Sequence, residues 1–336
     1  MQPSLILDLS LTSPAYSLAI NLVVISIVLS ALALGISRAI SSRKLWAWGV
    51  EELAQSIINA ILLGAIVSGA LASGEIASSF VEPDLIANCA YTMPNMPIPN
   101  SPLVLSICKI DYASSKAWNA AQSLGRLSFS LGSLSSITAN ANVISATPFY
   151  ALRDASSQYS QISYRLANII SAFEMQKQFL LFVSYAAFSI FLPAGLLLRM
   201  FFATRKLGGA IMAGAIGFFL VYPLCYSAFA SDMSSLNESY STLAKDLDLV
   251  SESILPFPAI DWGKSGVISN LVLNMSGQDV AAKVSVPMLS ASSFAAVLEM
   301  YSLVYPLICI AITLVCIYEL AGILGSEFRL DFFEKI

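Results

Sequence analysis

Histidine is absent from this chain, and charged residues are scarce. None of the 336 residues is His, and only 11% are charged, whereas a soluble globular chain is usually about 25% charged. The absence of His removes the commonest general acid–base group and the commonest transition-metal ligand. Hydrophobic residues make up 57% of the chain, a composition that suits segments surrounded by lipid. The formal net charge of −4 argues against a large exposed nucleic-acid surface.

The motifs of several enzyme classes are also missing. There is no G-x-x-x-x-G-K-[ST] sequence, so we do not expect nucleotide hydrolysis by this chain. No Asp falls within the long apolar stretches, which excludes intramembrane aspartyl proteases, and no group of residues has the spacing of a metal site. We therefore expect a protein that is not an enzyme and that has no cofactor.

Long apolar stretches are what the chain has instead. A transmembrane helix needs roughly 20 mainly apolar residues. The stretches that meet this length are residues 16–37, 53–74, 179–198, 207–231 and 300–323. The predicted fold class is therefore all-α, a polytopic helical membrane protein with about five transmembrane helices and an extracytoplasmic helical bundle.

Basic residues near the span ends predict the orientation. With five spans, three basic groups fall on one side of the membrane, which the positive-inside rule makes cytoplasmic. The groups are Arg38, Arg43 and Lys44; Arg199, Arg205 and Lys206; and Arg329 and Lys335. We expect a multi-pass protein of the cell membrane with its N-terminus outside and its C-terminus in the cytoplasm. The cluster Arg199, Arg205 and Lys206 has three possible explanations. The positive-inside rule alone accounts for it, or it contacts anionic lipid headgroups, or it contacts nucleic acid or a cytoplasmic ATPase.

The spans divide the chain into five regions. Two of these regions lie outside, and both carry apolar stripes at helical spacing, such as Leu124, Leu127, Leu131 and Leu134. A second stripe begins at Leu152 and continues into span three, and a heptad pattern from Leu236 to Ile254 is interpreted as a helix continuing out of span four. The predicted regions are 1–74 (N-terminal tail and spans one and two), 75–177 (extracytoplasmic helices with a Pro-rich loop), 178–231 (hairpin of spans three and four), 232–287 (second extracytoplasmic segment) and 288–336 (span five and cytoplasmic tail).

Two cysteines flank a Pro-rich loop in the first outer region. Cys89 and Cys108 are predicted to form a disulfide, which an oxidising exterior would preserve and which would stabilise the fold by about 3 kcal/mol. The alternative is a pair of buried free thiols. The second outer region contains two N-x-S sequons, at Asn237 and Asn274, which are candidate glycosylation sites.

Small residues recur at four-residue spacing in two spans. Gly64, Ser68 and Ala72 form one stripe. Gly209, Ala213 and Gly217 form the other. Small residues let helix backbones approach closely within a membrane. The stripes are interpreted either as a tight oligomer or channel wall, or as packing within one subunit, and the second interpretation is favoured for span two.

Prolines and acidic residues add further candidate sites in the spans. Pro193, Pro223 and Pro306 are expected to kink their helices. Glu299 is expected at the outer interface, with an intramembrane position as the alternative, and Glu319 has the same ambiguity near the inner end.

One stretch carries a family resemblance. Residues 191–226 read FLPAGLLLRMFFATRKLGGAIMAGAIGFFLVYPLCY, a Leu-Pro span, a basic turn and a Gly/Ala-rich span that ends in Tyr-Pro. This resembles archaeal polytopic membrane proteins of the Ced DNA-import channel-subunit family, which is related to the TrbL-type inner-membrane component of type IV secretion machines. The resemblance implies a membrane conduit for DNA that works with a cytoplasmic ATPase and with a pilin or small membrane subunits.

Two functions remain from the sequence. The first is an oligomeric membrane conduit or platform of a DNA-transfer or secretion apparatus, with membrane lipid, further copies of the chain and DNA in transit as partners. The alternative is a structural membrane anchor for an extracellular surface assembly, without a pore.

Overall fold

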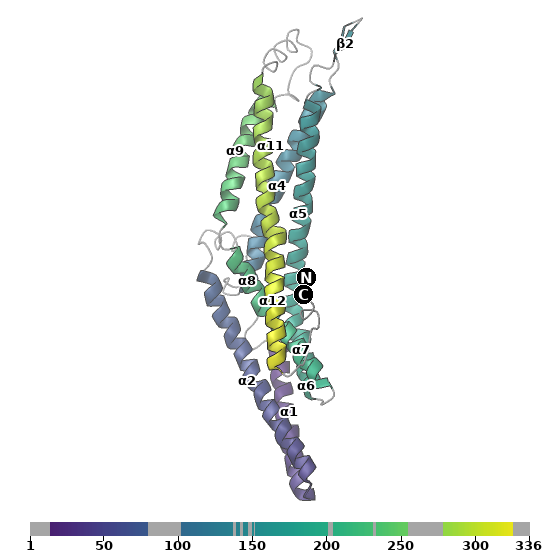
Figure 1. Ribbon diagram of the computed structural model, residues 1–336, viewed down its shortest axis with the longest axis vertical. Coiled ribbons are helices and arrows are strands. Elements are labelled where there is room, and N and C mark those ends of the chain that lie inside the picture. Colours follow the sequence, from purple (N-terminus) through teal and green to yellow (C-terminus); the bar gives the residue numbers. More distant parts are fainter. Residues whose placement is uncertain are drawn as a thin grey trace, which may run out of the picture. The chain divides into compact units, whose positions relative to one another are not determined.

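The structure is a computed structural model, and it is built almost entirely of helices (Figure 1). It describes residues 14–79, 102–136, 139–141, 144–146, 150, 152–200, 204–230, 233–254 and 278–324. The α-helices are α1 (Pro14–Ile40), α2 (Arg43–Ser79), α4 (Pro102–Ser135), α5 (Leu152–Ala186), α6 (Leu192–Met200), α7 (Arg205–Ile216), α8 (Tyr222–Phe229), α9 (Ser234–Ile254), α11 (Gln278–Glu299) and α12 (Tyr305–Ile323). Two short antiparallel strands, β1 (Ala139–Ala141) and β2 (Ile144–Ala146), pair with each other.

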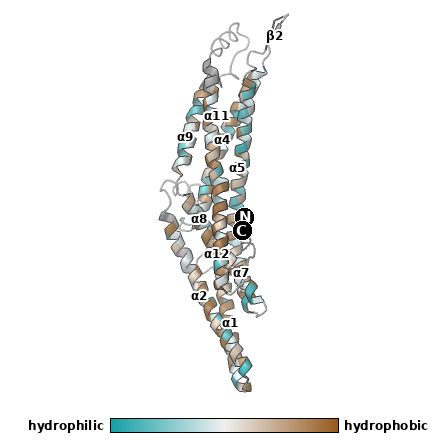
Figure 2. Ribbon diagram, viewed as in Figure 1, coloured by the Kyte–Doolittle hydropathy of each residue, from teal (hydrophilic) through white to brown (hydrophobic). Residues whose placement is uncertain are grey.

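Five helical runs in the described residues are long and apolar enough to cross a membrane, so the predicted all-α polytopic fold is confirmed. The runs are Ser17–Ile40, Arg43–Ile66, Leu152–Arg199, Arg205–Phe229 and Val284–Ile323. Figure 2 shows hydrophobic residues along much of α1, α2 and α12. The third and fifth runs have 48 and 40 residues, about twice the length that a bilayer requires. Parts of both helices must therefore extend beyond the hydrocarbon core.

The chain divides into two compact units, and each of the two longest runs contributes to both. The membrane unit comprises Met1–Lys109, Gln176–Ser231 and Pro306–Ile336, and the helical unit comprises Ile110–Met175 and Asp232–Tyr305. The division leaves residues 176–199 and 306–323 in the membrane unit, each close to the length of one span. Among the described residues, the membrane unit also takes in 75–79 and 102–109, which the sequence assigned to an outer region.

The first two helices of the membrane unit form a hairpin (Figure 1). Ser41 has a φ of 54° in the turn. The interface between α1 and α2 contains buried serines: Ser26 Oγ lies 2.5 Å from Ser56 Oγ, and Ser30 Oγ donates to the Ser26 carbonyl at 2.7 Å. Small polar side chains of this kind let membrane helices associate closely. Large apolar side chains of α1 are exposed on its other faces, as a lipid-facing helix requires: Leu18, Val24, Val28, Leu32 and Ile36.

A buried apolar core joins that hairpin to α6, α7 and α12. Ala19 and Val23 of α1 belong to one cluster with Leu196 of α6, Met212 of α7 and Ala321 of α12. The membrane unit is thus one packed body in which α1 contacts α6.

The helical unit is formed from α4, α5, α9 and α11. Its core contains the apolar stripes that the sequence predicted, and Leu124, Leu131, Tyr159, Leu166 and Leu236 are all completely buried. The helix period therefore identified the inward faces correctly. Helices α4 and α5 pack closely through small side chains. Ser128 Oγ donates to the Ser156 carbonyl and Ser156 Oγ donates to the Ser128 carbonyl, each at 2.8 Å.

The prediction that one helix continues out of span four is wrong, although a helix does follow that span. Helix α8 ends at Phe229 and a separate helix, α9, begins at Ser234. Ala230 closes α8 with φ −87° and ψ 23°, outside the α-helical region. Ser234 thus begins a new amphipathic helix rather than extending the span.

Each of the three predicted proline kinks coincides with a five-residue π-helix. These are η2 (Ala187–Phe191), η4 (Gly217–Val221) and η6 (Met300–Val304), and Pro193, Pro223 and Pro306 lie two residues beyond their ends. In η4, for example, the Tyr222 N–H donates to the Gly217 carbonyl, five residues back. Proline lacks an N–H, and its ring clashes with the carbonyl of the preceding turn. The wider π turn accommodates that clash without ending the helix.

Candidate functional site

The small residues of α7 and of the first position of η4 pack within the chain, against α12 and the residue that follows it. A Cβ on Gly209 would lie 3.0 Å from the Leu324 carbonyl oxygen, and a Cβ on Gly217 would overlap the Ile317 side chain. Ala213, between them, is completely buried. The stripe Gly209, Ala213 and Gly217 thus joins two helices of one subunit, which is the intramolecular alternative for span four.

The small residues of α2 have the opposite environment. Gly64, Ser68 and Ala72 are exposed, and no atom lies within 4 Å of the Cβ position of Gly64. Ser68 Oγ bonds only within its own helix, to the Gly64 and Ala65 carbonyls at 3.1 Å. The described residues therefore show no packing partner within the subunit for this stripe, although such packing was the favoured interpretation. We call Gly64, Ser68 and Ala72 the open face of α2.

Large side chains border the open face along the same helix. Ile61 precedes Gly64 and is 67% exposed, and Ile76 follows Ala72 and is 49% exposed. The exposed small residues thus lie along the helix between two exposed isoleucines. The opposite side of α2 carries the buried residues Ser56, Asn59 and Leu63, so the two sides of this helix have different roles.

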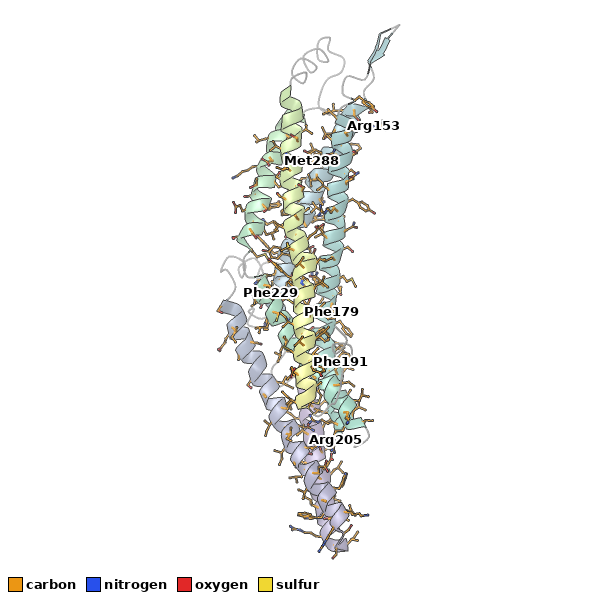
Figure 3. The ribbon with its side chains drawn as sticks, viewed as in Figure 1. Arg153, Phe179, Phe191, Arg205, Phe229 and Met288 are labelled. Atoms are coloured by element: carbon orange, nitrogen blue, oxygen red, sulfur yellow. The ribbon has the colours of Figure 1, made fainter. Side chains whose placement is uncertain are left out.

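The predicted basic cluster lies at the turn between α6 and α7, where it contacts α2. Arg205, labelled in Figure 3, bridges two carboxylates: its Nη1 lies 3.0 Å from Glu51 Oε1 and its Nη2 lies 2.8 Å from Glu52 Oε2. The apolar stretch predicted for span two starts at residue 53, just after Glu51 and Glu52, but helix α2 already begins at Arg43. The Glu52 side chain is buried where α2 meets the start of α7, and Arg205 compensates its charge there.

Arg199 is the most buried member of the cluster. It is 6% exposed, and its Nε and Nη1 atoms are buried without a hydrogen-bond partner in the described part of the chain. Lys206, by contrast, is exposed. The three basic residues that the sequence grouped together therefore have three distinct environments.

The helices that carry Arg199 and Arg205 cross at very short distance. A Cβ on Gly208 would lie 2.6 Å from the Gly195 carbonyl oxygen and 2.7 Å from the Arg199 amide nitrogen. Thr204 Oγ1 donates to the Leu198 carbonyl at 2.7 Å. Gly195 and Gly208 thus set how closely the end of α6 approaches the start of α7.

An apolar groove lies between α5 and α7 in the same unit. Its volume is about 320 Å³, and Phe179, Phe182, Phe191, Ile211 and Phe218 contribute to its walls. Phe179 and Phe191 are labelled in Figure 3. Phe179 meets Phe218 edge to face, with the ring centroids 5.8 Å apart. A groove with such walls suits an aliphatic chain rather than a polar solute.

Lys109 was not singled out from the sequence, yet it is completely buried in the membrane unit. It is 1% exposed, and its Nζ donates to the Ser227 carbonyl in the last turn of α8 at 2.7 Å. A cation is favourable at a helix C-terminus, where carbonyl groups lack partners. The signal in the sequence is a single charge within the mainly apolar run from Leu103 to Ile110.

The cysteines fall into two groups. Cys108 is disulfide-bonded, whereas Cys225, Cys309 and Cys316 are free. Cys89 lies outside the described residues, so its pairing with Cys108 remains a prediction.

The structure describes only one of the two predicted glycosylation sequons. Asn274 lies outside the described residues. Asn237 lies in α9, and its Oδ1 accepts a hydrogen bond from the Tyr112 hydroxyl at 2.5 Å. A helical, partly buried Asn does not present the surface loop that glycosylation requires.

Glu299 belongs to the helical unit, where Arg165 binds it in a bidentate pair. Arg165 Nε and Nη2 lie 2.5 and 2.6 Å from the two carboxylate oxygens. Both side chains remain substantially exposed, at 49% and 40%. Glu319 is exposed on α12.

Comparison with known proteins adds no relative to this picture. No family model, no curated protein and no solved structure matches the chain.

Proposed function

We propose that this chain is the membrane subunit of an oligomeric conduit or platform in a DNA-transfer apparatus. The observation that supports assembly is the open face of α2, where a Cβ added to Gly64 would meet no atom of another helix within 4 Å. Close helix contact in lipid needs small residues, because lipid offers no hydrophobic drive for association. The α7 stripe satisfies this rule within the subunit, and the open face of α2 is available to a second copy.

The DNA-transfer part of the proposal rests on the resemblance of residues 191–226 to the Ced family. The structure adds supporting detail to that stretch. Gly195 and Gly208 hold its two helices together, and Pro193 and Pro223 each follow a π-helix. π-helical turns occur frequently at functional sites. In this proposal the hairpin of α6 and α7 is the part of the subunit that changes conformation during transfer.

The proposed orientation places the α6–α7 turn in the cytoplasm and the helical unit outside the cell. A cytoplasmic ATPase then has access to the turn that carries Arg205 and Lys206. The helical unit, with its exposed Trp118, Phe129 and Tyr164, is available to a pilin or to small membrane subunits. DNA in transit passes within the assembly of subunits rather than through one chain.

The test is to fill the open face of α2. Replacing Gly64, Ser68 and Ala72 together with Leu adds bulk at positions that the subunit itself leaves empty, so the monomer should still fold. We expect the oligomer to dissociate to monomers in native gels and DNA uptake by the cells to fall to background. The control places Phe at Val24 and Val28, which are exposed and apolar on α1, and should leave both measurements unchanged.

The same substitution on α7 would not be informative. Leu at Gly209 or Gly217 would collide with Leu324 or Ile317 of the same subunit, so loss of activity could reflect loss of the fold. If the variant with Leu at Gly64, Ser68 and Ala72 still forms the oligomer, assembly through the open face of α2 is refuted.

The second candidate function is a structural anchor for an extracellular assembly, without a pore. The observation that favours it is the helical unit itself, which has its own core and a closely packed α4–α5 contact. A deletion strain separates the two functions. The conduit role requires loss of DNA uptake, whereas the anchor role requires normal uptake and loss of a surface structure.

A further inference from the structure

The end of the α1–α2 hairpin carries basic and large apolar side chains together. We define the hairpin tip as residues 36–50, which comprise the end of α1, the turn and the first residues of α2. Its large apolar side chains are 37–65% exposed, and they are Ile36, Ile40, Leu45, Trp46, Trp48 and Val50. Its basic side chains are exposed as well, and they are Arg38, Arg43 and Lys44. The tip contains no Asp or Glu, so three positive charges stand there without a negative one.

The two helices pack closely up to the turn. A Cβ on Gly49 would lie 3.0 Å from the Leu34 side chain. Ser37 is 2% exposed, and its Oγ donates to the Leu34 carbonyl at 2.7 Å. The Ser42 N–H donates to the Ser37 carbonyl at 3.1 Å. The exposed side chains of the tip therefore lie on the outer faces of a packed hairpin.

The ion pairs of Arg205 lie at a different level along this hairpin. Arg205 contacts Glu51 and Glu52. Arg43 precedes Glu51 by 8 residues, which is about 12 Å along a helix. The positive-inside rule predicts both basic groups at the membrane surface. A hairpin that stands across the membrane cannot place both at the same depth, so one of the two levels marks the surface.

The exposed side chains decide between the two levels. If the surface lay at Arg205, six large apolar side chains of the tip would stand in water, and exposed apolar surface of this extent marks an interface. If the surface lies at the tip, only the charges around Arg205 lie below it. There Arg205 opposes both carboxylates, and local thinning of the bilayer brings water to Glu51, whose side chain is 60% exposed. The tip therefore marks the surface, and the α6–α7 turn lies in an indentation that opens to the same side.

Continuity and charge identify what covers the tip. Val28 and Leu32 belong to the lipid-facing side of α1, and Ile36 and Ile40 follow at the same four-residue spacing, all of them exposed. Residues four apart lie on one face of a helix, so the lipid-facing side continues into the tip. The three positive charges complement an anionic headgroup layer. Trp is enriched at this boundary because one end of its ring system is apolar and the other is polar.

We infer that the hairpin tip binds the anionic headgroup layer of the membrane, with Trp46 and Trp48 at the boundary between headgroups and acyl chains. The three basic side chains contact lipid phosphates, and the aliphatic side chains enter the acyl region. The tip thereby sets the depth of the hairpin in the bilayer. This inference goes beyond the proposed function and does not depend on it, because a conduit and an anchor would use the same tip.

The first experiment measures the surroundings of the tip tryptophans in the full-length protein. The other two tryptophans are replaced, by Trp118→Phe and Trp262→Phe, and circular dichroism checks that helicity is unchanged. The protein is placed in nanodiscs of phosphatidylcholine and phosphatidylglycerol, which leave both membrane faces open to solvent. Phospholipids brominated on the acyl chain quench fluorescence from the lipid, and acrylamide quenches it from water. We expect quenching by the brominated lipids, and acrylamide quenching several-fold weaker than that of free tryptophan.

Two other results of this experiment would overturn the inference. Strong quenching by acrylamide without quenching by brominated lipid would place the tip in water. Absence of quenching by both reagents would show that protein covers the tip, either a second copy of the chain or another partner.

The second experiment tests the preference for anionic headgroups. Brominated phosphatidylglycerol and brominated phosphatidylcholine are compared at equal mole fraction. We expect stronger quenching by phosphatidylglycerol at low salt, and loss of the difference in 1 M salt, where the screening length is about 3 Å. This comparison needs no change to the basic residues, so it does not depend on how such variants fold. Equal quenching by the two lipids at low salt would overturn the inference.

A charge-matched pair of variants then locates the preference. The tip variant combines Arg38→Gln, Arg43→Gln and Lys44→Gln, and it should lose the preference for phosphatidylglycerol. The control variant removes three exposed charges of the helical unit, by Arg126→Gln, Arg153→Gln and Lys245→Gln, and it should keep the preference. Retention of the preference in the tip variant, or equal loss in both variants, would refute binding through the tip.

Discussion

The close crossing of α6 and α7 leads to a sharp prediction for Gly208. A Cβ at this position would lie 2.6 Å from the Gly195 carbonyl oxygen and 2.7 Å from the Arg199 amide nitrogen. Both are backbone atoms, so no side chain can rotate away to make room. Replacing Gly208 with Ala therefore requires the two helices to separate, and the loss extends to every contact along the crossing.

The magnitude follows from two opposing effects. Overpacking a tight contact costs about 1–3 kcal/mol, and two short backbone contacts place Gly208→Ala at the upper end of that range. Replacing Gly with Ala in a helix returns roughly 0.5–1 kcal/mol. We expect the free energy of unfolding to fall by about 2 kcal/mol, which is the difference between these effects.

The matched control is Gly214→Ala on the same helix. No atom lies within 4 Å of the Cβ position of Gly214, so only the helix-propensity gain of roughly 0.5–1 kcal/mol applies. The assay is equilibrium unfolding by SDS in mixed micelles, followed by helical circular dichroism. If Gly208→Ala is as stable as Gly214→Ala, then α6 and α7 do not cross at the distance described.

The charged residues provide three further predictions. Arg205→Gln should lower the free energy of unfolding by about 3 kcal/mol because it leaves Glu52 buried without its partner; restoration by a second Glu52→Gln change would support this, and additive losses would contradict it. Glu299→Gln should cost less than about 1 kcal/mol in the same assay because its pair with Arg165 is exposed, and a larger loss would show that the pair is shielded from solvent. Lys109→Met should cost about 2 kcal/mol through loss of a charged hydrogen bond, and an unchanged midpoint would refute the cap on α8.

The apolar stripes were predictable because helical geometry leaves a direct trace in the sequence. Leu124 and Leu131 repeat at a spacing that places them on one face, and both are completely buried. Length and hydropathy likewise predicted five spans, since lipid imposes a minimum apolar length. These features depend on local sequence and a known period.

The features that were missed depend on partners remote in sequence. Glu52 looked like a residue outside span two, and only the contact with Arg205, 153 residues away, explains its burial. The stripe with Gly64 was assigned to packing within the subunit because small residues alone do not reveal which helix covers them. Pro193 predicted a kink, but the choice of a π-helix to relieve the clash depends on the whole helix.

The most direct test of the account is cross-linking between subunits through the open face of α2. The free cysteines Cys225, Cys309 and Cys316 are replaced by Ala, and Ser68→Cys is introduced for oxidation in intact membranes. The account predicts covalent dimers from Ser68→Cys and monomers from Val28→Cys, a control on the exposed apolar face of α1. Monomers from Ser68→Cys, or equal cross-linking at both positions, would contradict assembly of this protein through α2.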